Sequence, residues 1–196
     1  MGLRNTDTGY GSVARFFHWS IAFLILVQFV TIVIFRVPGQ NPTDFDWEVL
    51  SWHKSSGLLI LVLCVGRIAW RWCFGLPAWP LNFAEWDKKV SHFTEWGLYA
   101  SLFVMTLSGI LIEITGGYYI PFFGLFFIDN RAPYFHAGPV SQEESVVAAR
   151  EALSIPVLAD FFVGLHVVFA YVLVALVAVH VAHVVRGVLV GDDQLE

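Results

Sequence analysis

The segment GLHVVFAYVLVALVAVHVAHVVRG, residues 164–187, is almost entirely apolar, yet it contains three histidines. An apolar stretch of this length is typical of a membrane-spanning helix, because about 20 helical residues cross ~30 Å of hydrocarbon. An imidazole ring is costly to bury in hydrocarbon, so a histidine at such a position points to a functional site. The segment therefore predicts a membrane span whose histidines have a partner.

The spacing of these histidines places two of them on one face of the helix. His166 and His180 are fourteen residues apart, which at ~100° per residue falls ~40° short of four full turns. The same separation is a rise of ~21 Å along the axis. His183 lies roughly 100° away from His166 around the helix. We therefore expect His166 and His180 to share a face at opposite depths of the membrane.

The composition extends this interpretation to the whole chain. Of its 196 residues, 57% are hydrophobic and 14% are charged, and the mean hydropathy is +0.68. Soluble domains are about 45–50% apolar and about 25% charged. We therefore expect an all-α integral membrane protein, one domain over residues 1–196, without a nucleic-acid partner. Its four transmembrane helices are expected at about residues 13–36, 52–74, 90–114 and 159–187.

The two cysteines, Cys64 and Cys73, form neither a CxxCH nor a CxxC motif. Covalently attached haem, a disulfide scaffold and thiol chemistry are therefore not expected.

Lysine and arginine predict the orientation. Four spans put both chain ends on one side, with the loop between the second and third helices. That side carries seven basic residues: Arg4, Arg15, Arg67, Arg71, Lys88, Lys89 and Arg186. The other side carries four: Arg36, Lys54, Arg131 and Arg150. The positive-inside rule therefore predicts that both termini are cytoplasmic.

The two connections on the outer side differ in length. Residues 36–51 are expected to form a short polar turn, and residues 115–158 a long loop. The aromatic part of that loop, GGYYIPFFGLFFIDNRAPYF (116–135), is interrupted by glycine and proline and is expected at the membrane interface. Helix-forming residues and a serine cap predict a short surface helix at 141–154.

On this topology four histidines fall into two pairs by depth. His53 lies at the outer end of the second helix, level with His166, and His18 lies at the inner end of the first helix, level with His180. Two imidazoles from facing helices are what a six-coordinate haem iron requires. We therefore expect these four histidines to bind two haems, one near each side of the membrane.

Other interpretations of the histidines stay open. Membrane histidines also form hydrogen bonds between helices. A small metal site would need ligands at one depth, for which His92, His180 and His183 are candidates. His136, in the long loop, is expected to be an ordinary surface residue. A haem-free transporter would need a continuous polar path, whereas the helix centres are almost purely apolar away from the histidines.

Small and basic residues near the histidines favour a cofactor. Gly57, Gly97 and Gly109 can admit a flat macrocycle, although glycine is also common at membrane helix interfaces. Lys54, Arg67 and Arg71 are expected to pair with haem propionates. For Arg71 in particular, anchoring at the lipid headgroups is an equal alternative.

These residues carry a resemblance to the bacterial cytochrome b561 family, whose superfamily includes the cytochrome b subunits of membrane-bound hydrogenases. The resembling segments are YGSVARFFHW (10–19), HKSSGLLILVLCVGRIAWR (53–71), SHFTEWGLYASLFVMTLSG (91–109), GGYYIPFFGL (116–125) and the paired histidines of 166–180. The resemblance implies a di-haem b protein of the bacterial inner membrane that exchanges electrons with quinone. The family's ligands match His18 with His180, and His53 with His166.

Quinone is the expected lipid-soluble partner, and its site needs a proton-handling group near a haem edge. His92, Glu95 and His183 are candidates for this quinone or proton site at the inner end, with Glu113 as a second possibility on the outer side. The alternative for each is an interfacial polar residue that makes ordinary hydrogen bonds. The outer reactant is expected to be superoxide, which would make the chain a quinone-linked oxidoreductase, or a redox protein docked on the long loop. Alternatively, the chain is the haem b membrane-anchor subunit of a hydrogenase or other dehydrogenase. The acidic end, GDDQLE, departs from the basic tail of many members.

Overall fold

The chain is analysed as a computed structural model that describes residues 2–7, 9–35, 43–79, 84–128 and 154–192. Its long elements are the helices α1 (Ser12–Phe35), α2 (Asp44–Phe74), α3 (Glu85–Thr115) and α5 (Pro156–Asp192). All four are long and apolar enough to cross a membrane. The expected four-helix membrane bundle is confirmed, with a short hairpin of β1 (Ile120–Phe122) and β2 (Phe126–Ile128) added to it.

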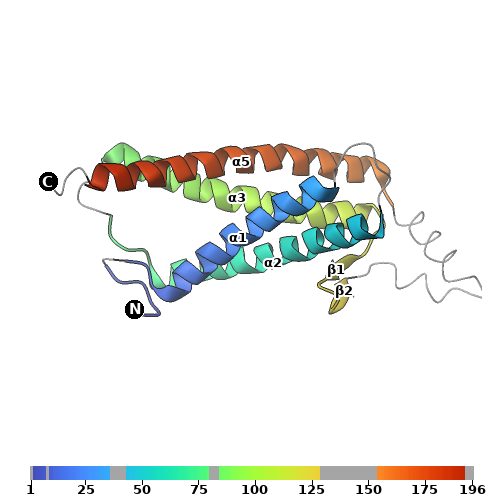
Figure 1. The fold of residues 1–196 in the computed structure, drawn as a ribbon, viewed down its shortest axis with the longest axis horizontal. Helices are drawn as coiled ribbons and strands as arrows, with labels where there is room; N and C mark the ends of the chain where they lie inside the picture. Colours follow the sequence, from blue (N-terminus) through green and yellow to red (C-terminus); the bar gives the residue numbers. More distant parts are fainter. Residues whose placement is uncertain (1, 8, 36–42, 80–83, 129–153, 193–196) are drawn as a thin grey trace, which may run out of the picture.

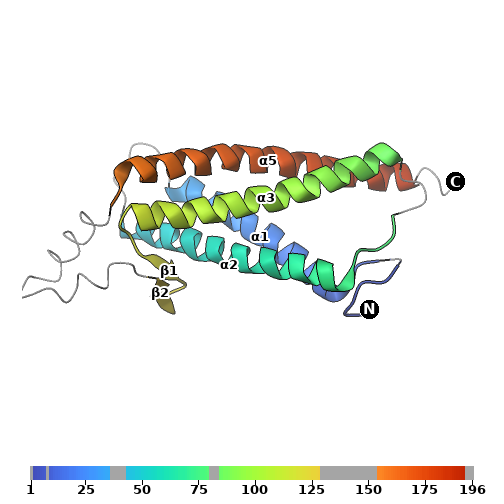
Figure 2. The same ribbon diagram turned by 180° about the vertical axis from the view of Figure 1, so that it is seen from behind.

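The helices form two pairs. α1 packs mainly against α2, and α3 packs mainly against α5. Figure 1 shows α5 alongside α3 and α1 running obliquely across α2, and Figure 2 shows the same arrangement from behind. The hairpin lies at one end of the bundle, here called the hairpin end. Both ends of the chain lie at the opposite end, here called the terminal end.

A polar cap makes α2 longer than its apolar stretch. The helix begins at Asp44, eight residues before the expected start, so residues 44–51 are helical rather than part of a polar turn. The Thr43 backbone N–H donates to Asp46 Oδ2 (2.6 Å), and Asp46 N–H donates to Thr43 Oγ1 (3.4 Å). This capping box satisfies amides at the helix start, and acidic residues there complement the helix dipole. Hydropathy alone therefore placed the start of α2 too late.

The other helices also extend beyond the apolar windows. α3 begins five residues before the expected residue 90. α5 begins three residues before residue 159 and continues five residues past residue 187. The residues added to α3 are mostly charged, whereas those added to α5 are mostly apolar. A helix can extend past the hydrocarbon because its backbone is hydrogen-bonded within the helix.

The buried core lies in the middle of the bundle and joins all four helices. It consists of Ile21, Ile60, Cys64, Leu102 and Leu173. Leu173 stands seven residues after His166 and seven before His180, so this apolar cluster separates the two depths at which α5 carries a histidine.

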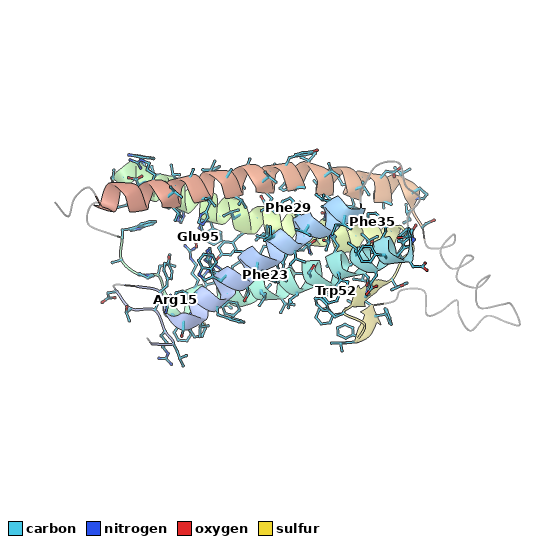
Figure 3. The ribbon with its side chains drawn as sticks, viewed as in Figure 1. Arg15, Phe23, Phe29, Phe35, Trp52 and Glu95 are labelled. Carbon is cyan, nitrogen blue, oxygen red and sulfur yellow. The ribbon has the colours of Figure 1, made fainter. Side chains whose placement is uncertain are left out.

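Many other large apolar side chains face outward. Phe23 of α1 has 65% of its surface exposed, while Phe29 of the same helix packs against the core. Figure 3 labels both phenylalanines. Such exposed apolar faces are suited to lipid.

Residues 120–128, within the aromatic part of the long loop, form the hairpin, which the sequence did not predict. Ile120 pairs with Ile128, and the turn uses positive φ angles at Phe123 (48°) and Gly124 (73°). The hairpin is held on α2 by the fully buried Ser55, whose hydroxyl accepts a hydrogen bond from Phe123 N–H (3.0 Å). The expected helix at 141–154 and His136 lie outside the described residues, apart from Ser154.

Candidate functional site

Four histidines face one another in two pairs across the bundle. The ring centres of His53 in α2 and His166 in α5 are 6.4 Å apart, with an interplanar angle of 62°. Those of His18 in α1 and His180 in α5 are 6.2 Å apart, with an angle of 57°. The first pair is here called the hairpin-end pair and the second the terminal-end pair. These are the pairs that depth along the helices predicted.

The spacing of the rings fits one metal ion between each pair. A metal–imidazole nitrogen bond is ~2 Å long, and the ring centre lies roughly 1.1 Å beyond the nitrogen, so two opposed ligands have centres ~6.3 Å apart. The observed 6.2 Å and 6.4 Å match this value. Direct stacking of the rings would bring their centres closer together. A direct hydrogen bond between the two histidines would need a hydrogen on one of the two facing nitrogens and none on the other. The donor set of two opposed imidazoles is that of a six-coordinate haem iron.

A hydroxyl group fixes the orientation of His53. Thr31 Oγ1 lies 3.1 Å from His53 Nδ1 and donates its own hydrogen to the carbonyl of Val27 (2.8 Å). A hydroxyl has a single hydrogen, so while that hydrogen goes to the carbonyl Thr31 can only accept from the ring. In the tautomer that fits this bond, His53 Nδ1 carries the proton and Nε2 keeps the lone pair that a metal requires.

Ser108 makes the same arrangement at His166. Its Oγ lies 3.1 Å from His166 Nδ1 and donates to the carbonyl of Met105 (3.0 Å). Next to it, a Cβ atom placed on Gly109 would lie 3.4 Å from His166 Cε1. The hairpin-end pair thus consists of two rings held through Nδ1, with Nε2 available on each.

At the terminal-end pair, Arg67 provides an unsatisfied donor. Its Nε donates to the Tyr99 hydroxyl (2.8 Å), and its charge acts on both His18 and His180. Its Nη1 is buried without a hydrogen-bond partner among the described residues. A buried donor without an acceptor is costly, and a guanidinium is well suited to bind a carboxylate. Arg67 is therefore placed as a propionate of a haem would require.

Two other expected propionate partners have protein partners in the structure. Lys54 Nζ pairs with Glu113 Oε2 at 2.6 Å, and both side chains are largely buried. Arg71 pairs with Glu95 and lies over the ring of Trp96 (5.2 Å). Figure 3 shows Glu95 directed from α3 toward the α1–α2 pair. These two cations are neutralised by acids that the sequence analysis considered only for proton transfer.

The expected glycines differ in what they face. Only Gly109 of the three borders a paired histidine. Gln28 of α1 lies over Gly57, with its Nε2 3.2 Å from the position of a Cβ. Gly97 faces Leu176, at 3.2 Å. Gly57 and Gly97 therefore serve helix packing.

The three candidates for a quinone or proton site do not meet at one point. His183 Nε2 lies 3.2 Å from Asp87 Oδ1, which also accepts from Arg186 Nη1 (2.5 Å). Glu95 is directed toward α2 instead. His92 lines a groove of about 660 Å³ on the terminal half of α3. The groove also contains Trp79, Lys88, Lys89, Phe93 and Trp96.

Within the described part of the chain, no group of three or more His, Cys, Asp or Glu side chains is arranged to hold a metal ion. A small metal site formed by His92, His180 and His183 is therefore not what the structure shows. The candidate metal ligands instead occur as two facing pairs of histidines.

Four residues of the site carried no motif that could be recognised in the sequence: Thr31, Ser108, Gln28 and Asp87. Gln28 Nε2 donates to the carbonyl of His53 (2.9 Å), so α1 contacts that histidine at both its backbone and its ring. The available signal was the presence of polar residues inside apolar spans at the depth of a histidine. The partners of these polar residues depend on how each helix is rotated about its axis relative to its neighbours. That rotation could not be inferred from the sequence.

The four-helix bundle and its two facing imidazole pairs define a class of membrane cytochromes. A family model described as prokaryotic cytochrome b561 matches residues 9–196. The chain belongs to this family of membrane haem b electron-transfer proteins. It is also similar to "Cytochrome b561 homolog 2" of Escherichia coli (strain K12), with 28% identity over 127 residues. That match covers 64% of this chain and 66% of the relative, just under two thirds of its length.

Proposed function

We propose that the chain is a di-haem b electron carrier with bis-histidine ligation at two depths of the membrane. The hairpin-end pair would hold one haem and the terminal-end pair the other. The observation that carries this proposal is the spacing of 6.4 Å and 6.2 Å between the ring centres of the two pairs. Membership of a haem b family supports the same cofactor.

Each part of the chain has a defined task in this proposal. α5 provides one imidazole at each depth, while α2 and α1 provide the opposing rings. Arg67 binds and neutralises an acidic substituent at the terminal end. The core around Leu173 excludes water between the two depths. Haem b supplies a one-electron couple, and ligation on both faces leaves no open position for oxygen.

The orientation follows the positive-inside rule, which places the terminal end on the cytoplasmic side of a bacterial inner membrane. Membrane quinone would exchange electrons at the terminal end, where the groove of His92 opens among aromatic and charged side chains. The reactant at the hairpin end would be superoxide or a redox protein. With superoxide as the donor, the chain would be a quinone-linked oxidoreductase.

A second candidate is the haem b membrane-anchor subunit of a hydrogenase or other dehydrogenase. The exposed hairpin favours it, because Leu125 is 77% exposed beside Phe126 and Phe127, and such a surface suits a catalytic partner as well as lipid. Co-purification of a catalytic subunit with the native protein would support this candidate. Quinone reduction by the isolated chain would oppose it.

The test of the proposal is a haem count on the purified protein. A dithionite-reduced minus oxidised spectrum and a pyridine haemochrome assay should give two b-type haems per chain. One haem would mean that one histidine pair does not bind iron. A colourless protein from haem-replete cells would favour a haem-free transporter, although the core cluster in the middle of the described bundle is apolar.

A further inference from the structure

We infer that Thr31 and Ser108 are positioning residues that set the orientation and the basicity of the two hairpin-end ligands, and thereby lower the reduction potential of the haem held there. This inference rests on the proposed di-haem function. It goes beyond that function by assigning two hydroxyl groups, one in α1 and one in α3, to the haem of the hairpin-end pair.

The direction of each hydrogen bond follows from the helix backbone. The hydroxyl of Thr31 donates to the carbonyl four residues earlier, and that of Ser108 donates to the carbonyl three residues earlier. Each oxygen then has only lone pairs for the imidazole, 3.1 Å away in both cases. The tautomer that fits both contacts has each ring as an Nδ1–H donor, which leaves Nε2 with the lone pair for a metal.

The two hydroxyls are firmly held. Thr31 is 9% exposed and Ser108 is 1% exposed, so water cannot easily replace either one. Gln28, one turn before Thr31, donates to the His53 carbonyl and to Ser56 Oγ (3.0 Å). The ring and the backbone of His53 are thus fixed from the same face of α1.

Such hydrogen bonds change the electronic character of a ligand. An imidazole that donates through Nδ1–H becomes a more basic ligand at Nε2. A more basic ligand stabilises ferric iron more than ferrous iron, which lowers the reduction potential. His53 and His166 would both ligate the same haem, so the effects of the two hydrogen bonds on its reduction potential would have the same sign.

The terminal-end pair has a different environment. Within the described residues, no hydroxyl group comes within hydrogen-bond distance of the ring nitrogens of His18 or His180. The charged neighbour there is Arg67. The loss of Thr31 or Ser108 hydroxyls should therefore change one redox couple and leave the other as an internal reference.

The experiment is a potentiometric titration of the full chain, with ferric electron paramagnetic resonance spectra as a second readout. Thr31→Val keeps the shape of the side chain and removes the hydroxyl, Thr31→Ser keeps the hydroxyl, and Ser108→Ala tests the other ring. Thr106→Val is the matched control, because the Thr106 hydroxyl makes the same backbone bond (2.9 Å to the Leu102 carbonyl).

We expect Thr31→Val and Ser108→Ala each to change the reduction equilibrium of one haem about tenfold. For a one-electron couple this raises its midpoint potential by ~59 mV. The low-spin ferric signal of the same haem should change, and Thr31→Ser should restore both readouts. Two haems with unchanged potentials and spectra in both variants would overturn the inference and leave the proposed function intact. An equal shift in Thr106→Val would also overturn it. A wild-type chain without haem would overturn both.

Discussion

The imidazole rings of His18 and His180 lie 6.2 Å apart, centre to centre, although 162 positions of sequence separate them. They come from the first and the last helix of the bundle, and these helices belong to different packing pairs. His53 and His166 bridge the same two helix pairs at the other depth. Metal ligation at both places would join the two halves of the bundle, so we expect stability and cofactor binding to be coupled.

Arg67 should contribute to haem binding at the terminal end. In Arg67→Gln, the buried cation near His18 and His180 is lost. Loss of a nearby positive charge disfavours the added electron, so one midpoint potential should fall, and haem should be released more easily on dilution in detergent. Lys89→Gln, a change at the surface groove, is the control. Equal potentials in wild type and Arg67→Gln would contradict this assignment.

Gly109 should limit the space behind His166. A Cβ at this position would lie 3.4 Å from the ring, which is ordinary van der Waals contact, so Gly109→Ala should retain both haems. Gly109→Leu should displace the ring and lose one haem of the two. Gly164→Leu is the matched control, because nothing lies within 4 Å of a Cβ there. The haem-to-protein ratio measures the effect, and full retention in Gly109→Leu would argue against ligation by His166.

The Lys54–Glu113 pair should stabilise the hairpin end as a unit. Removal of one partner from a buried ion pair typically costs about 3–5 kcal/mol, whereas an apolar replacement of both is often tolerated. These side chains are 17% and 13% exposed, so the lower part of that range or less is expected. Lys54→Met and Glu113→Leu should each lower the thermal midpoint in detergent, and the double variant should lose less than the sum. Strict additivity would show that the pair is not coupled.

His92 should be the candidate that matters for exchange with quinone. It lines the groove on α3, whereas His183 is held by Asp87 and Glu95 by Arg71. His92→Phe should therefore slow haem reduction by added quinol about a hundredfold or more, the usual size of the effect of a lost proton-transfer group. His183→Gln should mainly lower stability. A rate that falls only in the His183 variant would move the site to the Asp87 cluster.

The sequence predicted the features that depend on one helix at a time. The fourteen-residue spacing of His166 and His180, and the depth of His18 and His53, were sufficient to pair the four rings. Features that depend on the rotation of one helix against another were missed. Thr31 and Ser108 became visible only once the helices were packed, and the same packing placed Gln28 over Gly57.

Two further differences have local causes. The capping box of Thr43 and Asp46 extends α2 past its apolar part, and hydropathy carries no signal for such a cap. The hairpin at 120–128 depends on a turn at Phe123 and Gly124 and on its attachment to Ser55. Aromatic residues broken by glycine and proline are equally compatible with an irregular interfacial loop, which was the expectation.

The most direct test of the central claim is the haem content of variants in α5, the helix that provides a ligand at both depths. His166→Ala and His180→Ala should each retain one b-type haem per chain, the double variant should retain none, and His183→Ala should retain two. Pyridine haemochrome analysis of the purified proteins measures this directly. Two haems in either single variant, or a loss in His183→Ala equal to that in His180→Ala, would contradict the assignment of His166 and His180 as the ligands that α5 provides.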